Sequence, residues 1–266
     1  MTSVTVTYPT KRQPTGILAW LTTVDHKRIG ILYMTTAFIG FLLSGFLAMV
    51  IRAELSAPGM QFVTADQYNQ VFSIHGTTMI FVFIIPMLAG LGNYLVPLQI
   101  GARDMAFPRL NALGYWLYLF GAILMFGSFF APHGAAAIGW TAYPPLSTAQ
   151  FSPYTGVDLW IISVALSGTA SLLGGVNFLV TIAKMRAPGM GWFHMPLFTW
   201  GVFTANFMVL IATPMVTSGL ALLLADRHFG TQFYLIQGGG DPVLWQHLFW
   251  FYSHPAVYIM ILPAMG

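Results

Sequence analysis

A histidine and a tyrosine lie one helical turn apart near the end of this chain of 266 residues, within the segment WFYSHPAVY at positions 250–258. The spacing i, i+4 places the imidazole of His254 and the phenol of Tyr258 on one face of a helix. Such a pair could bind a metal through the imidazole, with a donor of protons or electrons beside it. On spacing alone, a polar pair that hydrogen-bonds neighbouring helices is an equally good interpretation.

The composition is that of a membrane protein. Hydrophobic residues make up 57% of the chain and charged residues 6%, with a mean hydropathy of +0.73. Such a small number of charged side chains cannot cover the surface of a soluble domain of this size. We therefore predict a polytopic protein in a lipid bilayer. The absence of cysteine excludes disulfides and thiolate sites, so a metal would have to use the seven histidines or carboxylates. A net charge of +3 is no indication of a nucleic acid partner.

Charge-free windows predict an all-α bundle of six membrane-spanning helices. They are expected at about 29–51, 71–96, 110–130, 159–183, 198–224 and 243–266. Prolines interrupt the second, fifth and sixth of these, at Pro86, Pro214, Pro255 and Pro263. Residues 1–28 are interpreted as a retained N-terminal tail, because their one apolar run is too short for a signal peptide.

The basic residues are divided unevenly between the two ends of the predicted helices. Eight of them fall on the side of the N-terminus, namely Lys11, Arg12, Lys27, Arg28, Arg103, Arg109, Lys184 and Arg186. Only Arg52 and Arg227 fall on the other side, where most of the acids lie. The positive-inside rule therefore predicts a cytoplasmic N-terminus, or a matrix-facing one in an organelle. In this topology His75 and His254 lie in the outer half at similar depths, which suggests two centres side by side.

Several long strings resemble those of one family, subunit I of the haem-copper oxidases, and most closely its A-type cytochrome c oxidases. They are IRAEL at 51–55, the stretch from HGTT at 75 to GNY at 94, IGARDMAFPRLN at 100–111, GWTAYPPL at 139–146, GGGDP at 238–242 and WQHLFW at 245–250. The likeness covers nearly everything after Leu21. The family has about twelve spans, so the six found by hydropathy would be its first half. The chain also stops inside a span at Gly266, and we expect it to be a fragment of a longer protein.

The resemblance implies the metal ligands. His75 would be an axial ligand of a low-spin haem, and His254 would bind the copper that faces a high-spin haem, with haem A the expected type. Tyr258 would be linked covalently to His254 and would supply an electron and a proton. From the residues alone, a core histidine bonded to a helix carbonyl is the favoured interpretation of His75.

Three further residues are implied to contact these cofactors. Arg52 would hydrogen-bond a peripheral oxygen of the low-spin haem, while Trp140 and Trp250 would line the pocket and the haem propionates. Spacing alone favours a snorkelling arginine for Arg52, and interfacial tryptophans remain the alternative for Trp140 and Trp250. The other histidines are interpreted as structural, namely His26, His133, His194, His228 and His247.

The resemblance also implies a proton path from the inner side. Asp104 would be its mouth, Asn93 and Asn111 would lie just inside, and Ser171 and Asn177 would be later polar steps. Without the resemblance, Asp104 is an ordinary solvated loop acid. Amides and hydroxyls in hydrocarbon must either hold water or bond neighbouring helices.

One departure from the family pattern affects the end of this path. Many A-type members carry Gly-His-Pro-Glu where this chain has Ser253-His254-Pro255-Ala256. Ala256 cannot carry a proton, so the hydroxyls of Tyr252 and Ser253 are expected to stand in for the carboxylate, as in a subgroup of the family. Hydroxyls relay protons through water but rarely ionise in an apolar site.

The sequence therefore predicts the catalytic subunit of a respiratory oxidase in a bacterial inner membrane. It would pass electrons from cytochrome c, or a fused cytochrome c domain, to a haem-copper centre, reduce O2 to water and pump protons, together with subunits II and III. A quinol oxidase is the nearest alternative, although residues 42–50 lack the ionisable pair of that branch. Nitric oxide reductases lack a counterpart of Tyr258, and a transporter without redox centres is the alternative from another class. Since later ligands are missing, we expect these 266 residues alone to turn over no oxygen.

Overall fold

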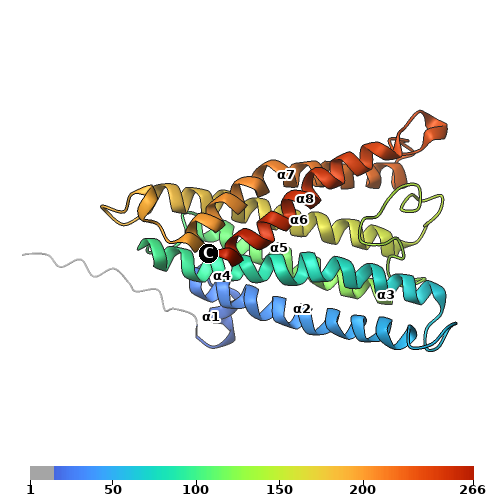
Figure 1. Ribbon diagram of the computed structural model, residues 1–266, viewed down its shortest axis with the longest axis horizontal. Helices are drawn as coiled ribbons and strands as arrows, with labels where there is room; N and C mark the ends of the chain where they lie inside the picture. The colour runs from blue at the N-terminus through green and yellow to red at the C-terminus, as the bar shows by residue number, and fades with distance from the viewer. Residues whose placement is uncertain (1–14) are drawn as a thin grey trace, which may run out of the picture.

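A computed structural model describes residues 15–266, and all regular structure within that range is helical (Figure 1). Six helical stretches are long and apolar enough to cross a membrane, as predicted. They are α2 (His26–Glu54), the combined stretch α3 (Ala65–Thr78), η1 (Met79–Ile84) and α4 (Ile85–Ile100), then α5 (Pro108–Gly127) continued by η2 (Ser128–Phe130), α6 (Thr155–Lys184), α7 (Leu197–His228) and α8 (Pro242–Met265). Short helices α1 (Ile17–Leu21), η3 (Trp192–His194) and η4 (Ile236–Gly238) lie between or before them. The helix α2 begins inside the predicted tail, at His26.

Local sequence signals explain where these helices begin and end. Asp25 caps α2, because its carboxylate accepts hydrogen bonds from the backbone N–H groups of Lys27 and Arg28 at 2.9 and 3.1 Å. A reciprocal capping box between Thr64 and Gln67 starts α3. At the far end of this stretch, Gly101 adopts the left-handed conformation that ends α4.

The long helices lie side by side and alternate in direction, so that their ends gather at two ends of the bundle (Figure 1). We call the end that holds the start of α2 the proximal end, and the opposite end the distal end. Helix α7 packs along α8, α5 along α6 and α2 along α4. The proximal end therefore also holds the loops α4–α5 and α6–α7, and the distal end holds the longer loop between η2 and α6.

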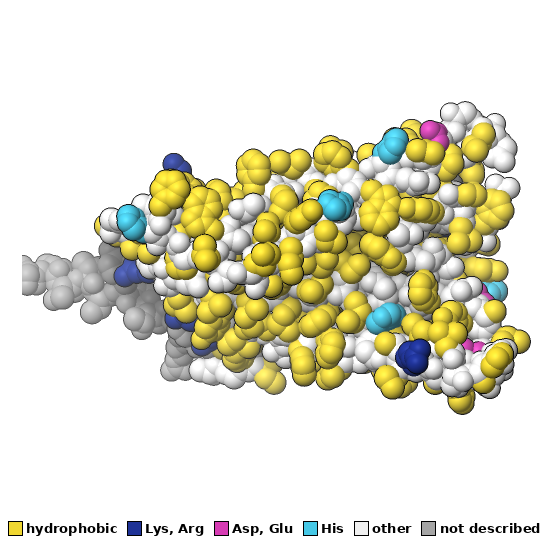
Figure 2. All heavy atoms as spheres, viewed as in Figure 1, with side chains coloured by type: hydrophobic (Ala, Val, Ile, Leu, Met, Phe, Trp, Pro, Cys, Tyr) yellow, Lys and Arg dark blue, Asp and Glu magenta, His cyan; other side chains and the backbone are white. Residues whose placement is uncertain are grey.

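Charge is separated between the two ends, as the sequence predicts. The described basic residues of the proximal end are Lys27, Arg28, Arg103, Arg109, Lys184 and Arg186, while Lys11 and Arg12 lie outside the described residues. The acids of the distal end are Glu54, Asp66, Asp158, Asp226 and Asp241. Between the ends the visible surface is a belt of hydrophobic side chains (Figure 2). This arrangement suits a multi-pass membrane protein.

The first and second spans approach each other through two glycines. A methyl group added to Gly90 of α4 would lie 2.9 Å from the carbonyl oxygen of Gly30 and 2.8 Å from Cγ of Met34, both in α2. These distances leave no room for a side chain, so the backbones touch at this point. Small residues at helix crossings are the usual means of close packing in a membrane.

We therefore expect Gly90→Ala to destabilise the protein by about 1–3 kcal/mol, because the added methyl group forces α2 and α4 apart. The matched control is Gly45→Ala, since a methyl group there meets nothing within 4 Å. That change should be neutral or stabilising by up to about 1 kcal/mol, because alanine favours helix. Thermal unfolding of the purified protein in detergent measures both, and equal melting temperatures for the two variants would contradict the packing argument.

Candidate functional site

The predicted pair on α8 faces away from the other five spans. The rings of His254 and Tyr258 lie 4.9 Å apart between centroids, at an interplanar angle of 69°. The side chain of His254 is exposed and Tyr258 is 46% exposed, although both lie in an apolar helix. Within the described residues neither ring makes a hydrogen bond. The pair is thus free to bind a ligand that approaches from outside these six spans, and exposure of an imidazole to lipid alone would be unfavourable.

The residues just before this pair point the other way. Tyr252 and Ser253 are buried inside the bundle. The ring of Tyr252 stacks on Phe81 of η1, with centroids 6.1 Å apart and an angle of 14°. The Ser253 hydroxyl has no hydrogen-bond partner among the described residues. Consecutive residues of α8 therefore present hydroxyls to the interior and the imidazole to the outside.

The imidazole of His75 is anchored on one nitrogen. Its Nδ1 lies 3.0 Å from the carbonyl oxygen of Ser44 and 3.2 Å from the Ser44 hydroxyl, which in turn lies 2.8 Å from the hydroxyl of Thr78. A carbonyl oxygen only accepts, so the bond to it places the proton on Nδ1. The lone pair of Nε2 is then available to a metal, in the arrangement by which proteins orient a ligating histidine.

A tryptophan from the distal loop lies between the two candidate ligand helices. A methyl group on Gly76, next to His75, would lie 3.3 Å from Cβ of Trp140. The ring of Trp140 also meets that of Trp250 edge to face, with centroids 5.9 Å apart, and the indole N–H of Trp250 donates to the Tyr143 hydroxyl. Trp140 thus connects the helix of His75 to the turn before His254.

Arg52 stands at the distal end of α2, where its side chain is exposed and makes no hydrogen bond to the described residues. Two residues later, Glu54 is buried and accepts hydrogen bonds from the backbone N–H groups of Gln61, Phe62 and Val63 at 2.7–3.1 Å. The loop after α2 is therefore fixed by Glu54, and the guanidinium of Arg52 is left available to an acceptor outside the described residues.

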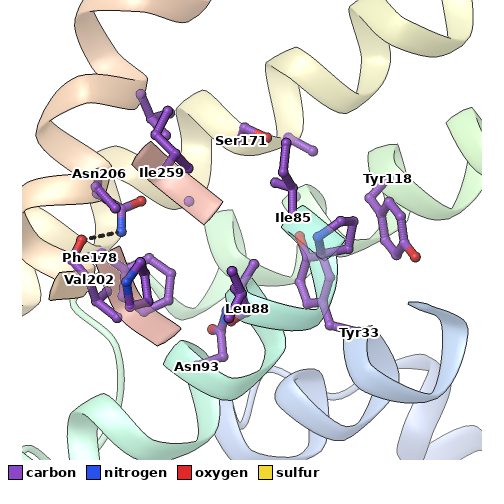
Figure 3. Close-up of a pocket in the computed structure, with 18 of the residues that line it drawn as sticks. Tyr33, Ile85, Leu88, Asn93, Tyr118, Ser171, Phe178, Val202, Asn206 and Ile259 are labelled. Carbon is purple, nitrogen blue, oxygen red and sulfur yellow. Dashed lines mark hydrogen bonds between the residues drawn. The ribbon is translucent and has the colours of Figure 1, made fainter. Parts of the chain in front are cut away.

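A cavity of about 70 Å³ lies between the spans in the proximal half of the bundle. Three of the predicted path residues line it, namely Asn93, Asn111 and Ser171. Figure 3 shows Asn93 of α4 and Ser171 of α6 at its wall, with Asn206 of α7 beside them. The volume is sufficient for a few water molecules, and the polar side chains in a mostly apolar wall supply partners for them.

Four polar residues of this wall did not emerge from the sequence, namely Tyr33, Tyr118, Ser167 and Asn206. Each is a polar residue in an apolar helix, and only this property could have marked it. The amide groups of Asn93 and Asn111 meet directly, since Nδ2 of Asn111 donates to Oδ1 of Asn93 at 2.6 Å. Nδ1 of buried His26 lies 2.7 Å from the backbone oxygen of Asn93, which gives this histidine a structural contact as predicted.

Asn177 is in a different place from the other predicted path residues, because it does not line the cavity. Its side chain holds the loop before α5, where Oδ1 accepts from the N–H of Phe107 at 2.9 Å and Nδ2 donates to the carbonyl of Phe107 at 3.1 Å. The neighbouring Ala106 N–H donates to Thr181 at 2.9 Å. This loop carries Asp104, which is half-buried. Asn177 therefore fixes the segment that holds the predicted mouth.

We expect Asn177→Ala to loosen this loop by about 0.5–1.5 kcal/mol, because the Phe107 N–H loses its partner and the Phe107 carbonyl keeps only the Asn111 N–H. Hydrogen–deuterium exchange should show faster exchange at Ala106 and Phe107. The control is Asn206→Ala, since Asn206 bonds only the carbonyl of Val202 in its own helix. Unchanged exchange at Phe107 in Asn177→Ala would show that the side chain does not fix the loop.

Residues 28–266 match the family described as Cytochrome C and Quinol oxidase polypeptide I. The chain is 51% identical over 244 residues to cytochrome c oxidase subunit 1 of Thermostichus vulcanus, covering 91% of this chain and 44% of that protein. It is 46% identical over 265 residues to cytochrome c oxidase subunit 1 of Corynebacterium diphtheriae, covering 97% and 47%. It is 49% identical over 250 residues to the heme-copper oxidase subunit I+III of Aeropyrum pernix, covering 94% and 31%. The chain spans about half the length, or less, of these curated relatives.

Proposed function

This chain belongs to the family of cytochrome c and quinol oxidase polypeptide I, and we propose that it forms part of the catalytic subunit of a terminal respiratory oxidase. The proposed reaction is oxidation of cytochrome c and reduction of O2 to water, coupled to proton pumping. One observation carries the proposal. Two imidazoles in separate spans, His75 and His254, both keep a ring nitrogen free, and Trp140 lies between their helices.

The residues around His75 fit a low-spin haem. The Ser44 carbonyl directs the free Nε2 of His75 outward, and an imidazole in this state is a good axial ligand for iron. Arg52, free at the distal end of α2, would hydrogen-bond a peripheral oxygen of the same haem. We propose haem A at this position, with a high-spin haem and copper at the second centre. When bound, these groups supply electron transfer and oxygen reduction, while the helices set ligands and access.

His254 would hold the copper, and the exposed face of α8 would be completed by residues outside this chain. Tyr258 lies close enough to His254 to hold a proton beside the metal, and the T-shaped contact at 4.9 Å is compatible with a covalent link after a small ring movement. Trp250 and Trp140 would fill the space between the two centres, since their rings already touch.

Protons would enter at the proximal end. Asp104 would take them up at the loop that Asn177 fixes, and water in the cavity between Asn93, Asn111 and Ser171 would carry them inward. The buried hydroxyls of Tyr252 and Ser253 would form the last step before His254. The unpartnered hydroxyl of Ser253 supports this, because a buried hydroxyl without a protein partner is a site for water.

The electron donor and surroundings are part of the same proposal. We favour cytochrome c, or a fused cytochrome c domain, over quinol, because residues 42–50 carry no ionisable side chain. Subunits II and III would be partners. The basic proximal end would face the cytoplasm of a bacterium and the acidic distal end the outside of its inner membrane.

Replacing each imidazole in the full-length oxidase tests the assignment of the two centres. His75→Ala should remove the absorption bands of the low-spin haem and abolish turnover. His254→Ala should retain those bands but lose copper and oxygen consumption. Absorption spectra, metal analysis and oxygen uptake measure these effects.

The control is His194→Ala, because this side chain is exposed in the loop between α6 and α7. It should leave spectra and turnover unchanged. If purified parent protein shows no haem bands, the oxidase proposal is wrong and a transporter becomes the better interpretation. If either histidine can be replaced without effect, its ligand role is wrong.

Removing the proton-accepting group at the proposed mouth should slow turnover about tenfold, the lower range of losses when a proton-transfer group is removed. We expect this for Asp104→Asn, with both haem spectra intact. Asp25→Asn is the matched control, since it removes the same charge at the same end and asparagine caps a helix equally well. Equal turnover of the two variants would mean that Asp104 is an ordinary loop acid.

A further inference from the structure

The second span contains an interruption in its backbone hydrogen bonds. Pro86 has no N–H, so the carbonyl four residues earlier, at Val82, loses its α-helical partner. The segment η1 is π-helical, and the N–H of Ile85 bonds the carbonyl of Ile80, so the carbonyl of Phe81 also loses its α-helical donor. Both carbonyls lie within an apolar span, where an unpaired backbone group is costly.

Two hydroxyls from other helices donate hydrogen bonds to these carbonyls. The phenol of Tyr118 in α5 donates to the carbonyl of Val82 at 2.8 Å, and the hydroxyl of Ser167 in α6 donates to that of Phe81 at 3.3 Å. Pro86, Tyr118 and Ser167 all line the cavity. The carbonyls of Val82 and Phe81 are thus each paired by one neighbouring span, and the pairing occurs at the cavity wall.

The orientation of the Tyr118 ring is fixed by its neighbours. It is 2% exposed and stacks on Tyr33 of α2, with centroids 5.3 Å apart and an angle of 16°. A stacked, buried ring has little freedom to turn, so its hydroxyl remains directed at Val82. Figure 3 shows Tyr33 and Tyr118 next to each other beside the start of α4.

The segment η1 is linked to residues close to both candidate ligands. It begins directly after Thr78, whose hydroxyl lies 2.8 Å from the Ser44 hydroxyl that contacts His75. It carries Phe81, whose ring stacks on Tyr252. A return to α-helical pairing would shift the register by one residue, which turns a side chain by about 100° around the helix axis. That rotation would break the contact between Phe81 and Tyr252.

We propose that Tyr118, assisted by Ser167, is a positioning residue that keeps η1 in its π-helical form and so holds Phe81 against Tyr252. Ser167 then joins the cavity to this contact, because it lines the cavity and pairs the backbone of Phe81. The pairing of the two η1 carbonyls by Tyr118 and Ser167 does not depend on the proposed function. Its consequence, a correctly placed Tyr252 hydroxyl for proton transfer to the second centre, rests on the proposed function.

The hydrogen bond from Tyr118 to the Val82 carbonyl is tested by restoring the backbone N–H that Pro86 lacks. In the full-length oxidase, Tyr118→Phe should speed hydrogen–deuterium exchange over residues 79–90 about tenfold, as expected when a buried carbonyl loses its partner. Pro86→Ala supplies a backbone N–H at the interruption. In the Pro86→Ala background, Tyr118→Phe should therefore change exchange by less than about twofold. An equal effect in both backgrounds would overturn the proposal.

The positioning role is tested by the pH profile of oxygen uptake. Tyr118→Phe and Ser167→Ala should slow turnover severalfold and shift the profile, with absorption spectra unchanged. The matched controls remove the same kinds of hydroxyl from other hydrogen bonds between spans. These hydrogen bonds do not involve η1. The controls are Tyr115→Phe, whose phenol bonds Thr36 at 3.1 Å, and Ser163→Ala, whose hydroxyl bonds the Gly121 carbonyl at 2.6 Å.

The outcomes separate the two proposals. Faster exchange in Tyr118→Phe with an unshifted pH profile would overturn the positioning role, as would equal shifts in the controls. If the parent protein takes up no oxygen, the oxidase assignment fails, while the exchange experiment still decides whether Tyr118 and Ser167 stabilise η1.

Discussion

A span in hydrocarbon must pair its backbone polar groups within the protein, because the lipid offers no hydrogen-bond partners. In this bundle that constraint decides where side-chain hydroxyls and amides can stand. Tyr118 pairs the carbonyl that Pro86 leaves free, and Ser167 pairs the carbonyl of Phe81. The cavity lies where these groups gather, since the polar atoms that satisfy the backbone also give water a wall to bind. The proposed route for protons is thus a consequence of how the helices satisfy one another.

The two proposed metal ligands are supported differently. His75 is fixed by the Ser44 carbonyl, so its direction is set before any cofactor binds. His254 makes no hydrogen bond to the described residues, and its neighbour Tyr258 is the one ring that it touches. An anchored ligand suits a haem that only exchanges electrons, because its geometry stays constant. An unanchored ligand depends on its metal and on the remaining ligands for its orientation, which suits a centre completed by further helices.

The spans could be predicted from the sequence because hydropathy over a bilayer thickness is a property of each segment alone. Which loops share an end of the bundle could be predicted for the same reason. Basic residues such as Arg103 and Lys184 identify their loops without information from other helices. The π-helical segment and the pairing of Phe81 by Ser167 could not be predicted, because they depend on which hydroxyl arrives from another span. The contacts of Asn177 could not be predicted for the same reason. Its neighbour is a loop backbone, which no local pattern reveals.

On the proposed function, the face of α8 would let hydroxyls take the place of a carboxylate near the copper. Ala256 is 3% exposed and belongs to the same buried apolar cluster as Tyr252. Positions 252 and 256 are four residues apart, so they share one face of the helix. A glutamate at 256 would project into that apolar cluster, where a charge is costly. A phenol at 252 lies on the same face without a permanent charge, and it can pass a proton through water while staying neutral. The chain can therefore lack the carboxylate and still present a proton-transferring group to the same interior, provided that Phe81 keeps the Tyr252 ring in place.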